Sequence, residues 1–243
     1  MSARDDILAK VRKAVAAAPD EAPSRRAVVE GRLGAHRRHP IPGRVAGKDP
    51  AALKALLRQH LETALVTVVD VATPAEIPAA VARYLRDQNL PQRIATGSDS
   101  YIDTLPWNRE PALSRRIGRA HPEDEVGLSR AVAGVAETGT LALASGPDNP
   151  VTLTFLPETH VVIVEESAIV GPYENVWDAM RARYGDGEMP RTVNFVSGPS
   201  RTADIGGKIV IGAHGPRRLC VLLVGSAAAP SGATVEAAGD RKG

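Results

Sequence analysis

Residues 217–225 read RRLCVLLVG, so that an unbroken apolar run stands between two arginines and a glycine. A strand with one solvated face alternates apolar and polar residues, whereas a continuous run is typical of a strand that is covered on both faces. The stretch VVIVEE at residues 161–166 has the same character. Together the two runs predict an α/β fold with a mostly parallel sheet between layers of helices, a three-layer sandwich.

The segments around these runs alternate between helical and strand-like patterns, which favours right-handed crossovers and a parallel sheet. Apolar residues recur at helical spacing in three segments, and short β-branched runs mark three more strands. The predicted helices cover residues 49–62, 73–88 and 172–185, and the predicted strands cover residues 64–71, 93–97 and 192–198.

The chain divides by composition into three parts. Residues 1–49 begin with a helix over residues 4–17, and the Pro-, Gly- and Arg-rich stretch from residue 19 to 50 predicts an extended linker. Residues 50–225 form the α/β domain. Residues 226–243 lack large apolar side chains, which predicts a disordered tail.

Composition narrows the class of protein. No window is apolar over the roughly 18 residues that a membrane span needs, and the start MSARDDILAK lacks the order of a secretory signal, so we expect a cytoplasmic protein. Cys220 is the one cysteine, so the chain cannot form an internal disulfide or hold an iron–sulfur cluster by itself. We expect its thiol to be buried in a strand and chemically inert.

The positive charge is concentrated near the start of the chain. Residues 1–48 hold 11 Lys or Arg against 5 Asp or Glu, while the remaining residues carry 19 against 23. Aromatic residues that could stack on bases are nearly absent from this arm, which argues against nucleic-acid binding and favours a solvated face or a contact between subunits of a homo-oligomer.

Three turn-rich segments suggest a ligand site, because ligands of open α/β sheets bind outside the carboxyl ends of the strands. They are ETGT at 137–140 with SGPDNP at 145–150, SGPSRTADIGGK at 197–208, and GAHGPRR at 212–218. The second leaves a strand and is predicted to open a short helix at SRTADI, which would cradle a phosphate or carboxylate. The candidate ligand-binding residues are Thr138, Gly139, Thr140, Ser197, Gly198, Ser200, Arg201, Thr202, Lys208, Gly215 and Arg217.

Glu137 and His214 are the candidate catalytic residues. His214 stands between turn glycines and is either an acid–base group or an exposed surface residue. Glu137 is either a group at the cleft or a carboxylate that accepts backbone hydrogen bonds in a hairpin turn or pairs with a nearby arginine. No metal-binding spacing, dinucleotide fingerprint, P-loop or GxSxG elbow occurs, so we predict no metal held by this chain.

The motifs AETGT, SGPDNP, LPETH, SGPSRTADI and GAHGPRRL, in this order over roughly residues 63–225, resemble the LUD-domain family and its lactate utilization C branch. The resemblance implies a fold like that of ribose-5-phosphate isomerase, family I CoA transferases and 5-formyltetrahydrofolate cyclo-ligase. It also implies a role in oxidising L-lactate to pyruvate with two iron–sulfur partner proteins, which would hold the clusters, while this chain would be a non-redox subunit with a small-anion or partner-binding cleft.

The wider fold suggests a second reading. In its CoA transferases, a glutamate in a Glu-Asn-Gly turn carries the acyl group, and the Glu137-Thr138-Gly139 turn is similar. The threonine in place of asparagine argues against covalent catalysis. The resemblance therefore implies only that Glu137 faces the cleft. The alternative function is an autonomous enzyme that acts on a phosphorylated, nucleotide-bearing or CoA-bearing metabolite.

Overall fold

The structure is a computed structural model that describes residues 3–16, 22–205 and 208–225, and the predicted disordered tail lies outside these ranges. The chain forms two compact units, Met1–Pro40 and Ile41–Gly243. No helix in the described ranges has the length and apolar character that crossing a bilayer requires.

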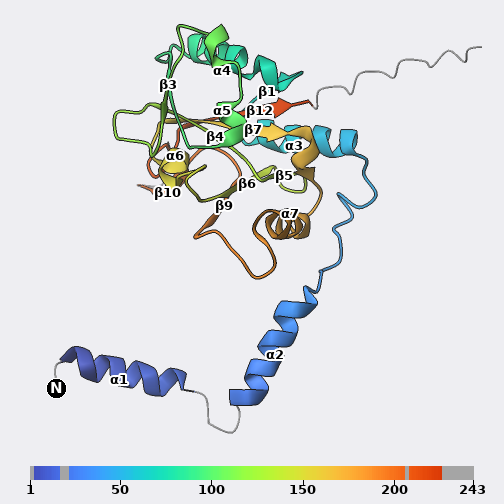
Figure 1. Ribbon diagram of the computed structural model, residues 1–243, viewed down its shortest axis with the longest axis vertical. Helices are drawn as coiled ribbons and strands as arrows, with labels where there is room; N and C mark the ends of the chain where they lie inside the picture. The colour runs from blue at the N-terminus through green and yellow to red at the C-terminus, as the bar shows by residue number, and fades with distance from the viewer. Residues whose placement is uncertain (1–2, 17–21, 206–207, 226–243) are drawn as a thin grey trace, which may run out of the picture. The chain divides into compact units, whose positions relative to one another are not determined.

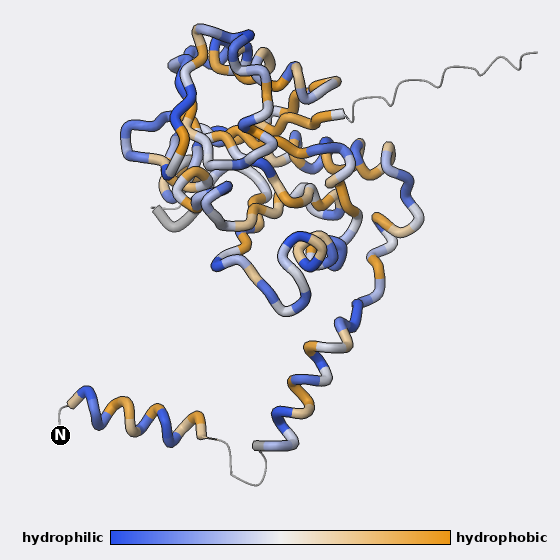
Figure 2. Tube along the Cα trace, in the orientation of Figure 1, coloured by the Kyte–Doolittle hydropathy of each residue, from blue (hydrophilic) through white to orange (hydrophobic). Residues whose placement is uncertain are grey.

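The first unit holds two helices, α1 (Ala3–Val15) and α2 (Ala22–Ala35). The predicted first helix is confirmed, but the prediction of an extended linker from residue 19 is wrong over α2. Alanine, arginine, valine and leucine dominate this segment, and an ion pair one turn apart joins Arg26 Nε to Glu30 Oε1 at 2.8 Å. A helix tolerates proline in its first turn, and the residues that follow it in α2 favour a helix. In Figure 2 the apolar residues of α1 and α2 alternate with polar ones along each helix.

The second unit is built on a six-stranded sheet in which every neighbouring pair is parallel (Figure 1). The two apolar runs form its centre, as predicted, because β12 pairs with β7 from Arg218↔Thr159 to Val224↔Glu165. In spatial order the strands are β1 (Thr67–Val71), β12 (Arg218–Val224), β7 (Thr159–Glu165), β4 (Val126–Arg130), β2 (Arg93–Thr96) and β3 (Ser114–Ile117).

Helices cover both faces of this sheet, which confirms the predicted α/β class. Alternate residues of the central strands enter opposite clusters: Ile163 packs with the cluster under α4 (Ile77–Asp87), and Val164 packs with the cluster under α3 (Pro50–Thr63). This division explains the unbroken apolar runs, because both faces of each strand are buried.

A second sheet of four strands lies on the α3 side, and the sequence patterns did not predict it as a separate sheet. Its order is β8 (Ile169–Val170), β5 (Ala133–Val135), β6 (Thr140–Ala144) and β9 (Val193–Val196). Its outer face packs against Val176 and Met180 of α7 (Glu174–Tyr184). Gly134 lets the sheet approach its neighbours, because a Cβ there would lie 2.8 Å from Leu57 Cδ2.

A hairpin of β10 (Arg201–Ile205) and β11 (Lys208–Ile211) corrects another prediction, since SRTADI was expected to open a helix. The strands pair in antiparallel fashion, with Arg201 opposite Ile211. The β-branched run of β11 explains the preference, because such side chains suit a strand better than a helix. The remaining short elements are η1 (Pro74–Glu76), α5 (Ser100–Asp103), η2 (Trp107–Arg109), α6 (Val151–Phe155) and η3 (Glu166–Ala168).

Candidate functional site

The predicted turns lie at the two ends of one antiparallel strand pair. β6 and β9 pair from Leu141↔Val196 to Ala144↔Val193. ETGT and SGPSR meet at one end, whereas SGPDNP lies at the other, roughly 13 Å away at the rise of a strand. The expectation that ETGT and SGPDNP share one cleft is therefore wrong, because a strand separates them.

Four hydroxyl groups form a cluster at the first end. Thr140 Oγ1 lies 2.7 Å from Thr138 Oγ1, 2.9 Å from Tyr173 Oη and 2.6 Å from Ser197 Oγ. Thr140 is fully buried. We call Thr138, Thr140, Tyr173 and Ser197 the hydroxyl cluster; it joins the predicted turns at 137–140 and 197–208 directly.

Both turns rest on the C-terminal end of α3. Gly139 adopts a φ of 67°, and a Cβ there would lie 2.5 Å from His60 Cβ. Gly198 adopts a φ of 136°, with Ala64 Cβ 3.2 Å from where its own Cβ would be. Glycine tolerates these conformations and approaches, so it fixes the turns against the helix. Arg201 also donates from Nη2 to Ala64 O at 2.5 Å.

A cavity of about 270 Å³ opens beside the cluster, and we call it the His160 pocket. It brings together six predicted residues: Ser197, Gly198, Ser200, Arg201, His214 and Gly215. No acidic side chain is among its described lining residues. The others that line it are Thr154, Phe155, His160, Phe195, Val196, Pro216 and Leu219.

His160 is the pocket residue that the site prediction missed. Its side chain is fully buried, its Nε2 lies 2.6 Å from Ser129 Oγ on the adjacent strand, and its Nδ1 has no hydrogen-bond partner among the described residues. Burial lowers the pKa of His160 to about 3, so the ring is neutral at pH 7. Thr154 Oγ1 is a second buried pocket atom without a described partner. The motif LPETH was the available signal, since it ends at this histidine.

His214 is exposed at the pocket, on a loop that is held by Ser200. The N–H of His214 donates to Ser200 Oγ at 3.3 Å, and the N–H of Gly212 donates to Ser200 O at 2.9 Å. The N–H of Ser200 in turn donates to Pro216 O at 2.9 Å. The loop at 212–218 therefore meets the loop at 197–208, as the sequence predicted.

This junction lies at the amino ends of β7 and β12, because His160 and Leu219 are the second residues of their strands and are paired with each other. The expectation that the GAHGPRR turn lies at the carboxyl ends is wrong. The turn precedes β12 in the chain, and all strands of the main sheet run in one direction.

Other predicted residues lie outside the pocket. Arg217 lines a neighbouring cavity of about 320 Å³. Its Nη1 lies 3.8 Å from Glu158 Oε2. Thr202 pairs with Val210 in the hairpin and is not among the pocket's lining residues. Lys208 begins β11, and its side chain lies outside the described part.

Glu137 is also absent from the described lining of the His160 pocket. It is 8% exposed, and Oε1 accepts from Arg44 Nη2 at 2.5 Å and from Arg44 Nε at 3.2 Å. Its N–H donates to Gly171 O at 3.2 Å. The carboxylate is thus held by a guanidinium from the segment before α3, which agrees with the alternative that Glu137 pairs with an arginine.

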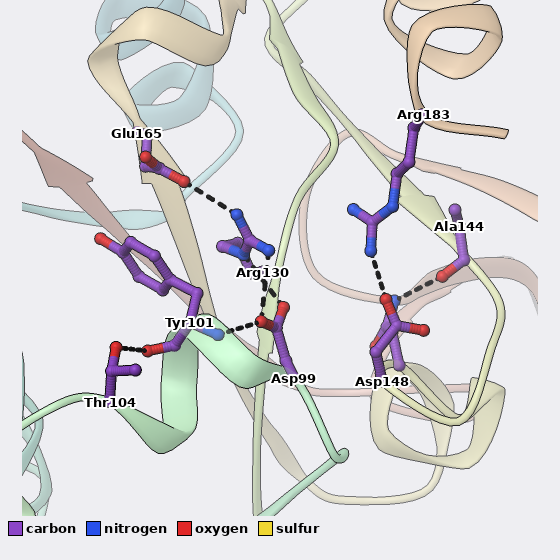
Figure 3. A network of polar contacts seen from close by, with 9 residues as sticks. Asp99, Tyr101, Thr104, Arg130, Ala144, Asp148, Glu165 and Arg183 are labelled. Atoms are coloured by element: carbon purple, nitrogen blue, oxygen red, sulfur yellow. Dashed lines mark hydrogen bonds and ion pairs between the residues drawn. The ribbon is translucent and has the colours of Figure 1, made fainter.

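A charge network occupies the carboxyl ends of the main sheet (Figure 3). Arg130, the last residue of β4, donates from Nε to Asp99 Oδ2 at 2.9 Å and from Nη1 to Glu165 Oε1 at 3.0 Å. Its guanidinium also lies 4.7 Å from the ring centre of Tyr101. Burial alone would lower the pKa of Arg130, but its hydrogen bonds to Asp99 and Glu165 outweigh this and raise it. The network holds the carboxyl ends of β4 and β7 together.

Metal-binding groups are not assembled in the described ranges: no three His, Cys, Asp or Glu side chains are placed to hold one ion. Cys220 is buried in β12, and burial raises the pKa of its thiol to about 12. The thiol is therefore protonated at neutral pH and is a poor nucleophile or metal ligand.

Comparison with known families gives one match over most of the chain. A model of the LUD domain matches residues 53–224. A crystal structure of a DUF162 family protein from Deinococcus radiodurans superposes with a TM-score of 0.57, covers 73% of this chain and 99% of its own, and is 23% identical. At that identity the similarity concerns the fold.

Several curated relatives share about a third of their aligned residues with this chain. Lactate utilization protein C of Shouchella clausii is 31% identical over 165 residues, 68% of this chain and 69% of its own. An uncharacterized protein of Neisseria meningitidis is 34% identical over 127 residues, 52% of this chain and 53% of its own. Lactate utilization protein C of Bacillus subtilis is 35% identical over 100 residues, 41% of this chain and 42% of its own. The chain thus spans about half the length of most of these relatives.

Proposed function

Because the LUD-domain model covers most of its length, the chain belongs to the LUD-domain family, and we propose that it acts in lactate utilization as a non-redox subunit that binds a small carboxylate. The observation that carries the proposal is the His160 pocket, with its two buried polar atoms that lack described partners. Relatives named lactate utilization protein C supply the metabolic context.

The pocket suits a small anion in size and charge. About 270 Å³ lies just below the usual range for drug-sized ligands, and a three-carbon acid is smaller than these. Arg201 provides a positive charge beside the cavity, and no carboxylate among the described lining residues opposes it. A guanidinium has five N–H donors, so Arg201 keeps donors for a ligand after its bond to Ala64 O. His160 Nδ1 and Thr154 Oγ1 are covered in this structure, so a ligand would reach them only after a shift of the lining side chains, and they would then gain the partners that buried polar atoms normally have.

Electron transfer is assigned to partner proteins in this proposal. Oxidation of L-lactate to pyruvate removes two electrons and two protons, and the electrons need an acceptor. The sole cysteine of this chain has a buried, protonated thiol, which argues against a cluster bound by cysteine ligands here. We therefore propose two iron–sulfur proteins as partners and electron acceptors, with this chain holding a carboxylate substrate or product.

Reconstitution tests the role of the chain. Lactate oxidation is measured with the two iron–sulfur partners, with and without this protein, and the full rate should need all three components. An unchanged rate without this chain would contradict the proposal. Glu137→Gln and His214→Ala belong in the same assay, because a small effect of Glu137→Gln is expected for a carboxylate outside the described pocket lining.

A binding experiment tests the His160 pocket independently of the assembly of the complex. Calorimetric titration with lactate and with pyruvate should give at least a tenfold loss of affinity in His160→Gln and Arg201→Gln. His121→Gln is the matched control, because His121 is an exposed histidine outside the pocket lining. Equal affinities in all variants would remove the His160 pocket from the proposal, even if reconstitution required the chain.

A further inference from the structure

A second cavity of the α/β unit is lined by residues other than those of the His160 pocket. It has a volume of about 820 Å³ and is lined by residues that follow β2 and β3 and by residues at the SGPDNP end of β6 and β9. This is the carboxyl side of the parallel strands β2 and β3, where open α/β sheets place ligands. Its size falls within the range of ligand sites. We call it the arginine groove.

Tight backbone contacts hold its walls. A Cβ on Gly97 would lie 1.9 Å from Asp148 O, so only glycine allows the turn after β2 to touch the SGPDNP turn. Ser98 N–H donates to Pro147 O at 3.0 Å across that contact. Ser145 and Thr192 exchange two bonds, Ser145 N to Thr192 O and Thr192 N to Ser145 Oγ, each 2.9 Å. The groove is therefore formed in advance of any ligand.

Its charge is positive and uncompensated. Arg119 and Arg191 line the groove, both are exposed, and neither guanidinium has a hydrogen bond or ion pair within the part of the chain that the structure describes. No described lining residue is acidic.

Nearby acids are already paired. Asp124 accepts from Arg116. Asp148 accepts from Arg183, as Figure 3 shows. Burial alone would raise the pKa of Asp124, but bonds from the His121 N–H and the Arg116 guanidinium outweigh it and lower the pKa, so Asp124 stays ionised and committed. Neither carboxylate is left to neutralise Arg119 or Arg191.

We infer that the arginine groove binds a small molecule carrying a dianionic phosphate group, at a site separate from the His160 pocket. Two free guanidinium groups match a net charge of −2, whereas a monocarboxylate such as lactate would neutralise one of them. Ser98 and Ser145 add hydroxyl groups to the lining. Both arginines come from loops, at 118–119 and 191–192, that line the same groove, and the contacts above fix the turns between them.

The test is calorimetric titration of the full chain with inorganic pyrophosphate at constant ionic strength. Arg119→Gln/Arg191→Gln should lower the affinity at least tenfold. Arg83→Gln/Arg86→Gln is the matched control, because it removes the same charge from exposed positions on α4 and should bind like the unmodified chain. Equal binding by both double variants, or no binding at millimolar pyrophosphate, would overturn the inference.

Two further titrations test the chemical class of the ligand and the location of its site. Tricarballylate, a tricarboxylate whose charge near neutral pH is close to that of pyrophosphate, should compete more weakly than pyrophosphate; tighter binding of tricarballylate would overturn the assignment to phosphate. His160→Gln should bind pyrophosphate with unchanged affinity, because its pocket lies at the other end of β6. A parallel loss in His160→Gln would show one shared site and overturn the separation, whereas failure of lactate binding alone would leave this inference standing.

Discussion

His160 and Gly97 show how single residues define the two cavities. His160 is a neutral imidazole on the second residue of the central strand β7, with one nitrogen bound to Ser129 and the other unpartnered among the described residues. Gly97 lacks a side chain where any side chain would enter the backbone of Asp148. The first residue contributes an unused hydrogen-bonding atom, and the second permits two turns to meet.

The buried imidazole predicts a pH dependence of stability. The pKa of His160 is lowered to about 3 in the folded chain, against about 6.5 in an unfolded one, so the unfolded state takes up the proton as the pH falls through 6.5. The free energy of unfolding should therefore fall towards acid, with a slope of up to about 1.4 kcal/mol per pH unit. Urea titrations at pH 7, 6 and 5 should show a smaller acid loss in His160→Gln.

Between pH 7 and 5, the effect of His160 is separate from that of Asp70 and Asp124, because the pKa values of these two carboxylates are lowered and they titrate at lower pH. The other histidines remain in both proteins and cancel. The same pH slope for the two proteins would contradict a neutral buried His160.

Gly97→Ala should destabilise the chain by about 1–3 kcal/mol, because the new methyl group must displace the backbone of Asp148. Gly43→Ala is the control: nothing lies within 4 Å of a Cβ at that position, so its effect should stay within about 0.5 kcal/mol. Thermal unfolding of both variants measures the difference, and equal melting temperatures would show that the turns do not touch.

Among the elements, α3 has the largest influence on the proposed carboxylate site. Its inner face carries Leu57 and Leu61 into the core, and its C-terminal end supports the turns at Gly139 and Gly198. Burial of the helix therefore sets the position of the hydroxyl cluster. The helix begins at Pro50, after the N-cap residue Asp49.

The N-cap gives a test of this element. The Asp49 carboxylate accepts from Ala52 N–H at 2.7 Å, so Asp49→Ala should cost about 1 kcal/mol, whereas Asp49→Asn, which keeps an acceptor, should cost much less. Chemical denaturation measures both. Equal losses for Ala and Asn would mean that the charge, and not the hydrogen bond, supports the helix.

At the scale of the whole molecule, the core belongs to the second unit. No residue of α1 is buried, and the described side chains of α2 are exposed, whereas the main sheet is apolar on both faces. The stability of the fold should therefore depend little on residues 1–40.

Deletion of residues 1–40 should shift the melting temperature by only a few degrees, because little buried apolar surface is lost. The fragment keeps Arg44, whose guanidinium pairs with Glu137. Calorimetry compares it with the full chain. If the fragment no longer unfolds cooperatively, the first unit contributes to the core. If the fragment is stable but does not support lactate oxidation with the partners, residues 1–40 act in assembly of the complex.

The amino-acid sequence by itself determined four strands of the main sheet, β1, β2, β7 and β12, the helices α3, α4 and α7, and the family, but it did not predict β3 and β4. Long apolar runs have no stable place except a sheet covered on both faces, and helical periodicity is local, so both are legible along the chain. The helix α2 and the β10–β11 hairpin were misread because weak local preferences decide such segments.

Only the tertiary structure decided how the sites are composed. The sequence joined ETGT to SGPDNP because they are neighbours in the chain, but β6 holds them apart, and ETGT meets the loop at 197–208 instead. It did not single out His160, whose second ring nitrogen has no partner among the described residues, or the groove that Arg119 and Arg191 both line. Such juxtapositions depend on strand register and on packing between distant segments, which no local pattern records.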